Sequence, residues 1–211
     1  MGRLLYTLGL LGVTLGLVVY RQAVTGTVHY GFLYWNLMLA FIPLVVAGAI
    51  RLLHPVSDPL KLTLSWLLFP LWLSFFPNAP YMLTDLMHVY RPFSMPFWYD
   101  PIMLCSAAFS GLFAGFISLN WVQITLGAQA SPRGLSVLTF LLWPLTGLGI
   151  YLGRILRWNS WDVISRPVAL MGDIALIFRF PGQHQEAWLL ISVYTMVLIF
   201  LYGVWQSPSP S

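Results

Sequence analysis

Long apolar runs separated by short polar stretches dominate the pattern of this 211-residue chain. A helix needs about 20 apolar residues to cross the roughly 30 Å of hydrocarbon in a bilayer. Six runs meet or approach this length. They lie near residues 3–20, 31–50, 61–77, 101–126, 134–153 and 186–205. The pattern therefore predicts an all-α fold, a polytopic bundle of about six transmembrane helices.

Three of the apolar segments need a closer interpretation. The run at 61–77 is the shortest and contains Pro70, which predicts a kink. Residues 168–180 are too few to span a bilayer and include Asp173, so we expect a short interfacial or re-entrant helix there. The first run is long for a signal peptide and no small-residue cleavage site follows it, so we interpret it as a transmembrane helix.

Composition supports lipid as the solvent of this chain. Hydrophobic residues make up 59% of it and charged residues 8%, whereas soluble domains carry about 25% charged residues. We expect one transmembrane domain over 1–206 and a disordered tail at 207–211. No basic run suggests nucleic acid as a partner. Several cations are expected to anchor the ends of spans, namely Arg3, Arg21, Arg51, Lys61 and Arg133.

Small residues recur at four-residue spacing in three of the expected spans. Such ridges let helix backbones approach closely inside a membrane, so we interpret them as contacts within the bundle. They are Gly12 and Gly16, then Ala107, Gly111 and Gly115, then Gly149 and Gly153.

Six spans divide the connectors between two sides of the membrane. One side receives the loops at 21–30, 78–100 and 154–185, which hold both of the polar segments discussed next. The same side receives five of the six acidic residues, Asp85, Asp100, Asp162, Asp173 and Glu186. We therefore expect the two polar segments to meet at one membrane face. The distribution of Arg and Lys does not determine the orientation of the chain.

The first polar segment, residues 75–88, follows the third run. Asn78 is expected to cap a new helix, with Pro80 in its first turn. Tyr81, Asp85 and His88 would then share one helical face. Asp85 and His88 are close enough at this spacing to act as an acid/base pair or to form part of a metal site. A capped turn with a structural Asp–His contact explains the same residues.

The second polar segment, residues 153–162, is denser. Arg154 and Arg157 lie one turn apart, and two guanidiniums on one face suit a phosphate group. If the fifth helix continues, Arg154 and Arg157 also lie over Trp158 and Trp161 as cation–π pairs. An interfacial girdle of Trp and Arg is the alternative. Asn159 and Asp162 favour a site, because a girdle needs neither an amide nor a carboxylate.

Other polar residues are expected at the same face. Asp100 precedes Pro101 and can be explained as an N-cap alone. Asn36 is polar at apolar depth and needs a partner. The resulting candidate cluster contains Asp85, His88, Asp100 and Asp162 as catalytic candidates, and Asn36, Asn78, Tyr81, Arg154, Arg157, Trp158 and Asn159 as binding candidates. No familiar hydrolase, nucleotide-binding or zinc motif is present, and we assign no metal or cofactor.

Several blocks of the sequence resemble an uncharacterised bacterial family of membrane proteins, the domain of unknown function 1361. The most specific blocks are PNAPYMLTDLMH from Pro77 and LGRILRWNSWD from Leu152, with WNL from Trp35, WYD from Trp98 and GLFAGFISL from Gly111 in the same order. The resemblance implies a multi-pass protein of the bacterial inner membrane. It implies no chemistry, and it marks the two polar segments as characteristic of the family.

Three functions remain open on the sequence alone. The first is an enzyme that binds an anionic lipid headgroup or lipid-linked phosphate through Arg154 and Arg157, with proton transfer by Asp85 and His88. The second is a non-catalytic membrane partner or assembly factor, in which the acidic and basic residues pair as a structural clasp. The third is a small-solute or ion-coupled transporter. A transporter needs a polar path to the opposite side of the membrane, and the sequence has few polar residues there.

Overall fold

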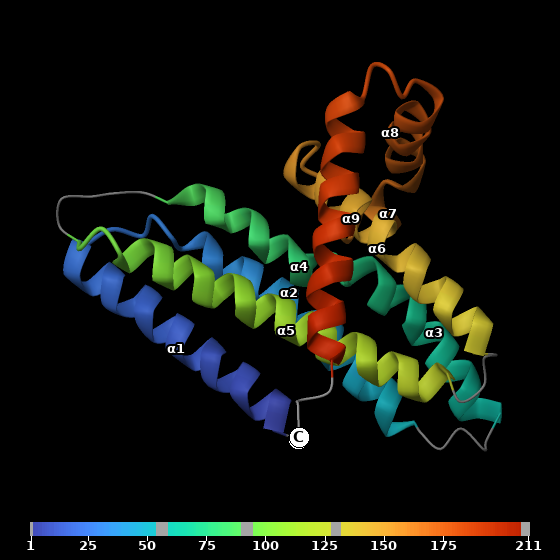
Figure 1. Cartoon of the computed structure of the whole chain (residues 1–211), viewed down its shortest axis with the longest axis horizontal. Helices are drawn as coiled ribbons and strands as arrows, with labels where there is room; N and C mark the ends of the chain where they lie inside the picture. The colour runs from blue at the N-terminus through green and yellow to red at the C-terminus, as the bar shows by residue number, and fades with distance from the viewer. Residues whose placement is uncertain (1, 54–58, 90–94, 128–131, 208–211) are drawn as a thin grey trace. The chain divides into compact units, whose positions relative to one another are not determined.

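The computed structural model describes residues 2–53, 59–89, 95–127 and 132–207 (Figure 1). Regular structure in these ranges is helical, without a strand. The elements are α1 (Gly2–Thr25), α2 (Phe32–Leu52), α3 (Pro59–Phe75), α4 (Asn78–Tyr81), the 3-10 helix η1 (Met82–His88), α5 (Tyr99–Gly127), α6 (Pro132–Arg154), α7 (Asp162–Ser165), α8 (Pro167–Arg179) and α9 (Gln185–Gln206). The all-α prediction is confirmed. Most of the predicted disordered tail lies outside the described residues.

Five helices, α1, α2, α5, α6 and α9, are long and apolar enough to cross a membrane. They coincide with five of the six predicted spans and indicate an integral membrane protein. The sixth prediction corresponds to α3, whose 17 residues extend about 25 Å. This length is at the lower limit for a span. The short helix expected at 168–180 is present as α8.

Contacts between Cα atoms group the chain into two compact units, Met1–Thr125 and Leu126–Ser211. The first unit, unit 1, contains α1 to η1 and nearly all of α5. The second, unit 2, contains α6 to α9. The single domain expected from the sequence stays a prediction.

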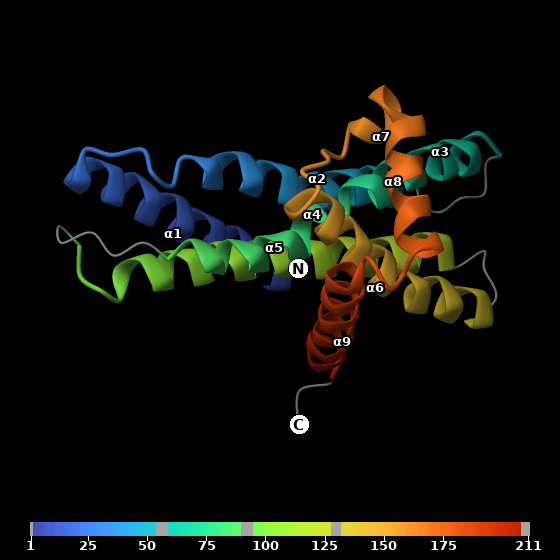
Figure 2. The same cartoon turned by 90° about the horizontal axis from the view of Figure 1, so that it is seen from above.

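In unit 1, α1 and α5 lie side by side and run in opposite directions (Figures 1 and 2). The Tyr99 hydroxyl donates to the Leu17 carbonyl oxygen over 2.8 Å. About two turns further along α5, the Thr14 hydroxyl lies 3.0 Å from Ser106 Oγ, and both side chains are buried. Hydroxyl groups that bond a helix carbonyl or each other are satisfied without water, which suits a contact between two spans.

The α4–η1 segment packs closely on the small-residue face of α5. A Cβ atom added at Gly111 would lie 2.9 Å from the Ala79 carbonyl oxygen, and one at Gly115 would lie 2.8 Å from Ala79 Cβ. The predicted ridge on α5 is therefore confirmed as a helix contact. The ridge on α1 is different, because no described atom of unit 1 lies within 4 Å of a Cβ added at Gly12 or Gly16. Within unit 1 those two glycines therefore do not form the predicted helix contact.

In unit 2, α6 and α9 form a close pair, and α8 packs across it. A Cβ atom added at Gly147 of α6 would lie 2.9 Å from the Ile191 carbonyl oxygen of α9. Leu170 and Ile177 of α8 are buried in a cluster with residues of α6 and α9, including Leu152 and Ala187. The chain between the two spans is thus held against them rather than left as a loose loop.

The contact of α4 with α5 predicts the cost of filling one glycine. Gly111→Ala places a methyl group against a backbone carbonyl that cannot rotate away, and overpacking of this kind costs about 1–3 kcal/mol. Thermal unfolding of the detergent-solubilised protein measures the effect. Gly12→Ala is the matched control, since its Cβ meets open space and alanine favours the helix. Equal melting temperatures for the two variants would contradict the packing.

Candidate functional site

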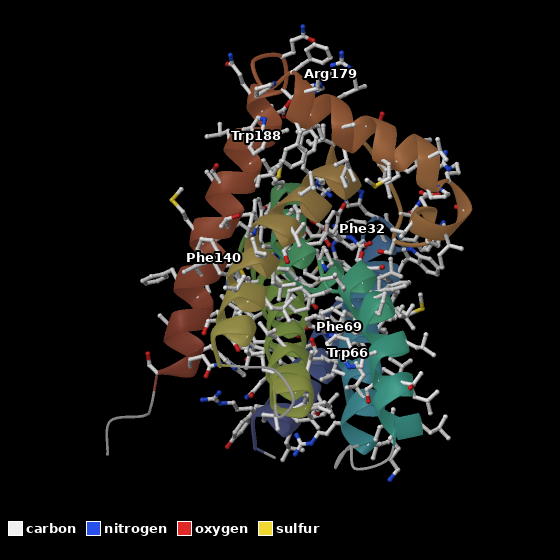
Figure 3. All side chains as sticks on the ribbon, turned by 90° about the vertical axis from the view of Figure 1, so that its right-hand side faces the viewer. Phe32, Trp66, Phe69, Phe140, Arg179 and Trp188 are labelled. Carbon is white, nitrogen blue, oxygen red and sulfur yellow. The ribbon has the colours of Figure 1, made fainter. Side chains whose placement is uncertain are left out.

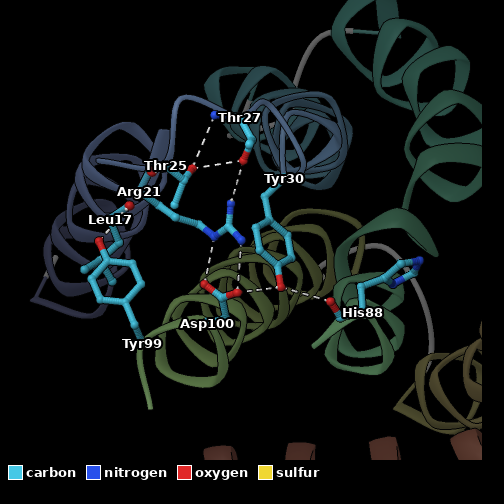
Figure 4. Close-up of polar contacts among 8 residues, drawn as sticks. All are labelled: Leu17, Arg21, Thr25, Thr27, Tyr30, His88, Tyr99 and Asp100. Carbon is cyan, nitrogen blue, oxygen red and sulfur yellow. Dashed lines mark hydrogen bonds and ion pairs between the residues drawn. The ribbon is translucent and has the colours of Figure 1, made fainter. Parts of the chain in front are cut away.

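A buried ion pair joins α1 to α5 in unit 1 (Figure 4). Arg21 Nε lies 2.8 Å from Asp100 Oδ1, and Arg21 Nη2 lies 3.2 Å from Asp100 Oδ2. Arg21 is 1% exposed and Asp100 is 2% exposed. The two parallel bonds form the planar fork that Arg makes with a carboxylate. Arg21 was expected to be a membrane-flanking anchor, and that interpretation is wrong, because the guanidinium faces the interior.

Tyr30 extends this pair toward η1. Its ring lies 4.4 Å from Arg21 Cζ, and its hydroxyl lies 3.0 Å from both Asp100 Oδ2 and the His88 carbonyl oxygen. One hydroxyl proton therefore serves two acceptors. Thr27 Oγ1 accepts from Arg21 Nη1 over 3.3 Å. Asp100 lies inside the first turn of α5, which begins at Tyr99. Its carboxylate bonds these side chains, so capping alone does not explain it.

Asp85 and Asn36 meet within unit 1, as the need of Asn36 for a partner predicts. Asn36 Nδ2 donates to Asp85 Oδ2 over 2.9 Å. Asp85 is fully buried, whereas His88 is exposed and its ring lies 5.1 Å from that of Phe32. The segment is a 3-10 helix from Met82 onward. A 3-10 helix has three residues per turn, so Asp85 and His88 share a face, whereas Tyr81, four residues before Asp85, does not. The predicted common face of all three residues is therefore wrong.

Asn78 does not cap α4. The helix begins at Asn78 itself, with Pro77 before it, and no side chain caps it. Asn78 Nδ2 instead donates to the Phe75 carbonyl oxygen over 3.0 Å, at the end of α3. The amide thus satisfies a carbonyl that the end of a helix leaves without an intrahelical donor. The break between the two helices was therefore predicted correctly, but Asn78 caps the end of α3 instead of the start of α4.

In unit 2, α6 ends at Arg154 and the chain turns sharply. Arg157 has φ +60°, the only positive φ of a non-glycine residue in the described ranges. A left-handed residue is common after a helix, but it is usually Gly or Asn. The Arg157 side chain is exposed, and in the described part of the chain no hydrogen bond or ion pair engages its guanidinium. An unfavourable backbone conformation thus presents a cation to the surroundings.

Asp162 holds this turn in shape. Its Oδ2 accepts from the Asn159 backbone N–H over 2.8 Å, and its Oδ1 accepts from Ser165 Oγ over 3.0 Å and Arg166 Nε over 3.1 Å. The bond from Asn159, followed by those from Arg166 and Ser165, lowers the pKa of Asp162 against the opposing effect of burial. The carboxyl is therefore ionised at neutral pH. It acts as an acceptor that positions the turn and is poorly suited to donate a proton.

Trp158 is held between two partners that the sequence did not predict. The Arg166 guanidinium lies 4.7 Å from its ring centroid, and Trp158 Nε1 donates to Asp173 Oδ2 of α8 over 2.9 Å. The predicted cation–π pairs required α6 to continue past Arg154. Because the helix ends there, that condition is not met, and in the described residues Arg157 makes no cation–π contact with Trp161.

The structure brings some of the predicted site residues together, but it does not test whether the two polar segments meet. Asn36 meets Asp85 in unit 1, and Arg154 to Asp162 form one turn in unit 2. Asp85 and the two arginines belong to different units, so their meeting at one site stays a prediction. Among the described residues, no three His, Cys, Asp or Glu side chains group closely enough to hold a metal.

Four residues that contribute to these contacts were not among the predicted site residues: Arg21, Tyr30, Arg166 and Asp173. Arg166 lies four residues after Asp162, a spacing typical of a helical ion pair, so a signal for it was present. Arg21 and Asp100 are 79 residues apart, and nothing in the local pattern links them.

The chain belongs to a known family. The model of the family described as "Protein of unknown function (DUF1361)" matches residues 35–201, and this range includes both polar segments. The resemblance found in the sequence is therefore confirmed. No curated protein and no solved structure matches the chain.

The Arg21–Asp100 pair predicts a large loss of stability when one partner is removed. Arg21→Gln leaves a buried carboxylate without its cation, at a cost of about 3–5 kcal/mol. The double variant Arg21→Met/Asp100→Leu removes both charges and is expected to recover most of that loss. Thermal unfolding in detergent measures both. Arg51→Gln, which removes an exposed cation, serves as the control; a drop as large for this control would argue against a special pair.

The conformation of Arg157 predicts a stabilising substitution. Arg157→Gly removes a left-handed strain of roughly 1–2 kcal/mol, so the melting temperature is expected to rise. Ile155→Gly, two residues earlier and without positive φ, is the matched control and is expected to lower it. A fall for both variants would show that the Arg157 side chain, rather than its backbone, stabilises the turn.

Proposed function

We propose that this is a multi-pass protein of the bacterial inner membrane that binds an anionic lipid headgroup or a lipid-linked phosphate at residues 154–166, the basic connector. One observation carries the proposal. Arg157 is exposed and without a side-chain partner in the described residues, in a backbone conformation that glycine would adopt with less strain. Strain of this kind is often found at binding sites, where the surrounding structure maintains it.

The charges of the basic connector favour an anion. It contains Arg154, Arg157 and Arg166 against one carboxylate, Asp162, and that carboxylate already bonds Arg166 and the Asn159 backbone. A net positive charge therefore remains. Arg binds phosphate through a planar fork of donors, which makes phosphate a better match than an uncharged headgroup. Asn159, two residues after Arg157, is also exposed and offers an amide donor.

The position of the connector in the chain favours a lipid as the source of the phosphate. It joins α6 directly to α8 and leads on to α9, and both long helices are apolar enough to span a membrane. Arg and Trp both favour the depth of lipid headgroups. A cation at this depth meets phosphodiesters of the bilayer at high local concentration.

The proposal covers binding. A reaction on the bound lipid, with proton transfer by Asp85 and His88, stays a prediction from the sequence. For Asp100 the structural clasp is the better supported role, because Arg21 and Tyr30 occupy both of its oxygens in a buried setting. Asp162 acts in the proposal by positioning Arg157 and Asn159.

A binding measurement with defined probes tests the proposal. Fluorescence anisotropy of a short-chain labelled phosphatidylglycerol, with the purified protein in uncharged detergent micelles, is expected to show saturable binding that the phosphatidylcholine analogue lacks. Arg157→Gln is expected to weaken binding about fivefold to tenfold, as loss of one charge-assisted contact at a partly solvated site would.

Two controls separate the site from general charge attraction. Arg51→Gln removes an equal charge from unit 1 and is expected to leave binding unchanged. Arg157→Gly is expected to weaken binding while the fold is retained. Equal weakening by Arg51→Gln, or full binding by Arg157→Gly, would overturn the proposal.

A further inference from the structure

Helix α8 is apolar on both of its faces. Leu170 and Ile177 point into the cluster shared with α6 and α9. The opposite face is exposed, with Val168 at 86%, Met171 at 60% and Phe178 at 56%. Ile164 of α7, which precedes α8 in the chain, is also 82% exposed. Several large apolar side chains exposed on one short segment are uncommon on a protein in contact with water and mark an interaction site.

The polar group that α8 carries does not face outward. Asp173 lies at the edge of the inner face, where it accepts the Trp158 indole N–H. The outward face therefore presents no charge between Arg166 before the helix and Arg179 at its end. A helix that is apolar all round belongs in an apolar medium on each side.

The length of α8 and its packing on α6 and α9 restrict where the apolar medium on its outer face can be. Thirteen residues extend about 20 Å, which is too short to cross the hydrocarbon core. Packing of α8 against the C-terminal part of α6 and the N-terminal part of α9 keeps it at one end of this helix pair. That end is where two membrane spans leave and re-enter the bilayer, so the boundary between headgroups and acyl chains is the apolar medium within reach.

Cations lie at both ends of the apolar face. Arg157 and Arg166 precede the helix, and Arg179 ends it, with its guanidinium 5.5 Å from the Phe180 ring centroid. Figure 3 shows Arg179 at the turn between α8 and α9. Arg side chains at the ends of an apolar helix reach the phosphates while the helix lies below them. The arrangement matches a leaflet that contains anionic lipids.

We propose that α7 and α8 lie in the membrane interface, with Ile164, Val168, Met171 and Phe178 among acyl chains, and that the phosphate bound by Arg157 is the headgroup of a lipid in that leaflet. The depth of α8 does not depend on the proposed function, whereas the identity of the ligand rests on it. The inference excludes a soluble phosphate as the main ligand and gives α8 the task of holding the lipid's acyl region.

Depth is tested with a fluorophore on single cysteines. Cys105→Ser provides a cysteine-free protein, to which Met171→Cys, Gln183→Cys or Phe140→Cys is added. In proteoliposomes of phosphatidylcholine and phosphatidylglycerol, the label at Met171 is expected to be quenched by a lipid-attached nitroxide and shielded from aqueous iodide, as at Phe140 on α6. The label at Gln183, in the exposed turn before α9, is expected to show the reverse.

Other results for the label at Met171 would overturn the placement. Quenching by iodide as strong as at Gln183 would put the face in water. Shielding from both quenchers would show that protein covers it, whether unit 1 or a second copy of this chain. Either result leaves the binding measurement for Arg157 standing, so the two proposals fail separately.

The source of the phosphate is tested by competition. Unlabelled phosphatidylglycerol is expected to displace the labelled lipid at concentrations at least about tenfold below those of glycerol 3-phosphate, because acyl chains add to binding. Equal potency would assign the site to a soluble phosphate. Met171→Glu places a charge on the outward face. It is expected to weaken binding of the labelled lipid and to leave the affinity for glycerol 3-phosphate unaltered.

Discussion

A polar side chain inside a bilayer needs a partner within the protein, and unit 1 is arranged around that constraint. Arg21 and Asp100 bond each other from α1 and α5, and Tyr30 joins them to the carbonyl of His88. Asn36 bonds Asp85 in the same way across α2 and η1. These contacts fix the relative positions of four elements that apolar packing alone would hold less specifically. The close approach of Ala79 to Gly111 and Gly115 then sets how deeply α4 enters the bundle.

Unit 2 uses its polar groups in a different manner. Two carboxylates stabilise the turn after α6. Asp162 accepts hydrogen bonds from the Asn159 backbone and Arg166, and Asp173 accepts one from the Trp158 indole. Arg157 and Arg179 have no carboxylate partner in the described residues, and they lie on either side of the apolar face of α8. Cations without a carboxylate partner are able to bind an anionic ligand. The contrast between the units is therefore consistent with the binding role proposed for the basic connector, which rests on the exposed and strained Arg157.

The sequence predicted the helices well because span length and hydropathy are local properties. Five spans, the short helix α8 and the break at Pro77 to Pro80 all follow from residues that are close together in the chain. The pairing of Arg21 with Asp100 did not follow, because it joins positions 79 residues apart and Arg21 looks like any cation at the end of a span. The end of α6 was predicted to within one residue, but the left-handed turn that follows it was missed. Arg157 carries no local signal for a left-handed backbone, since the residues usual at that position are Gly and Asn.

The distance along the chain between Arg21 and Asp100 has a consequence for biogenesis. Ribosomes add about 5–20 residues per second, so α1 enters the membrane several seconds before its partner carboxylate has been made. During that interval the guanidinium remains among headgroups and water, because burial without a counter-charge is unfavourable. The buried pair can therefore form only after Asp100, in the first turn of α5, has been translated, however early α1 itself is made.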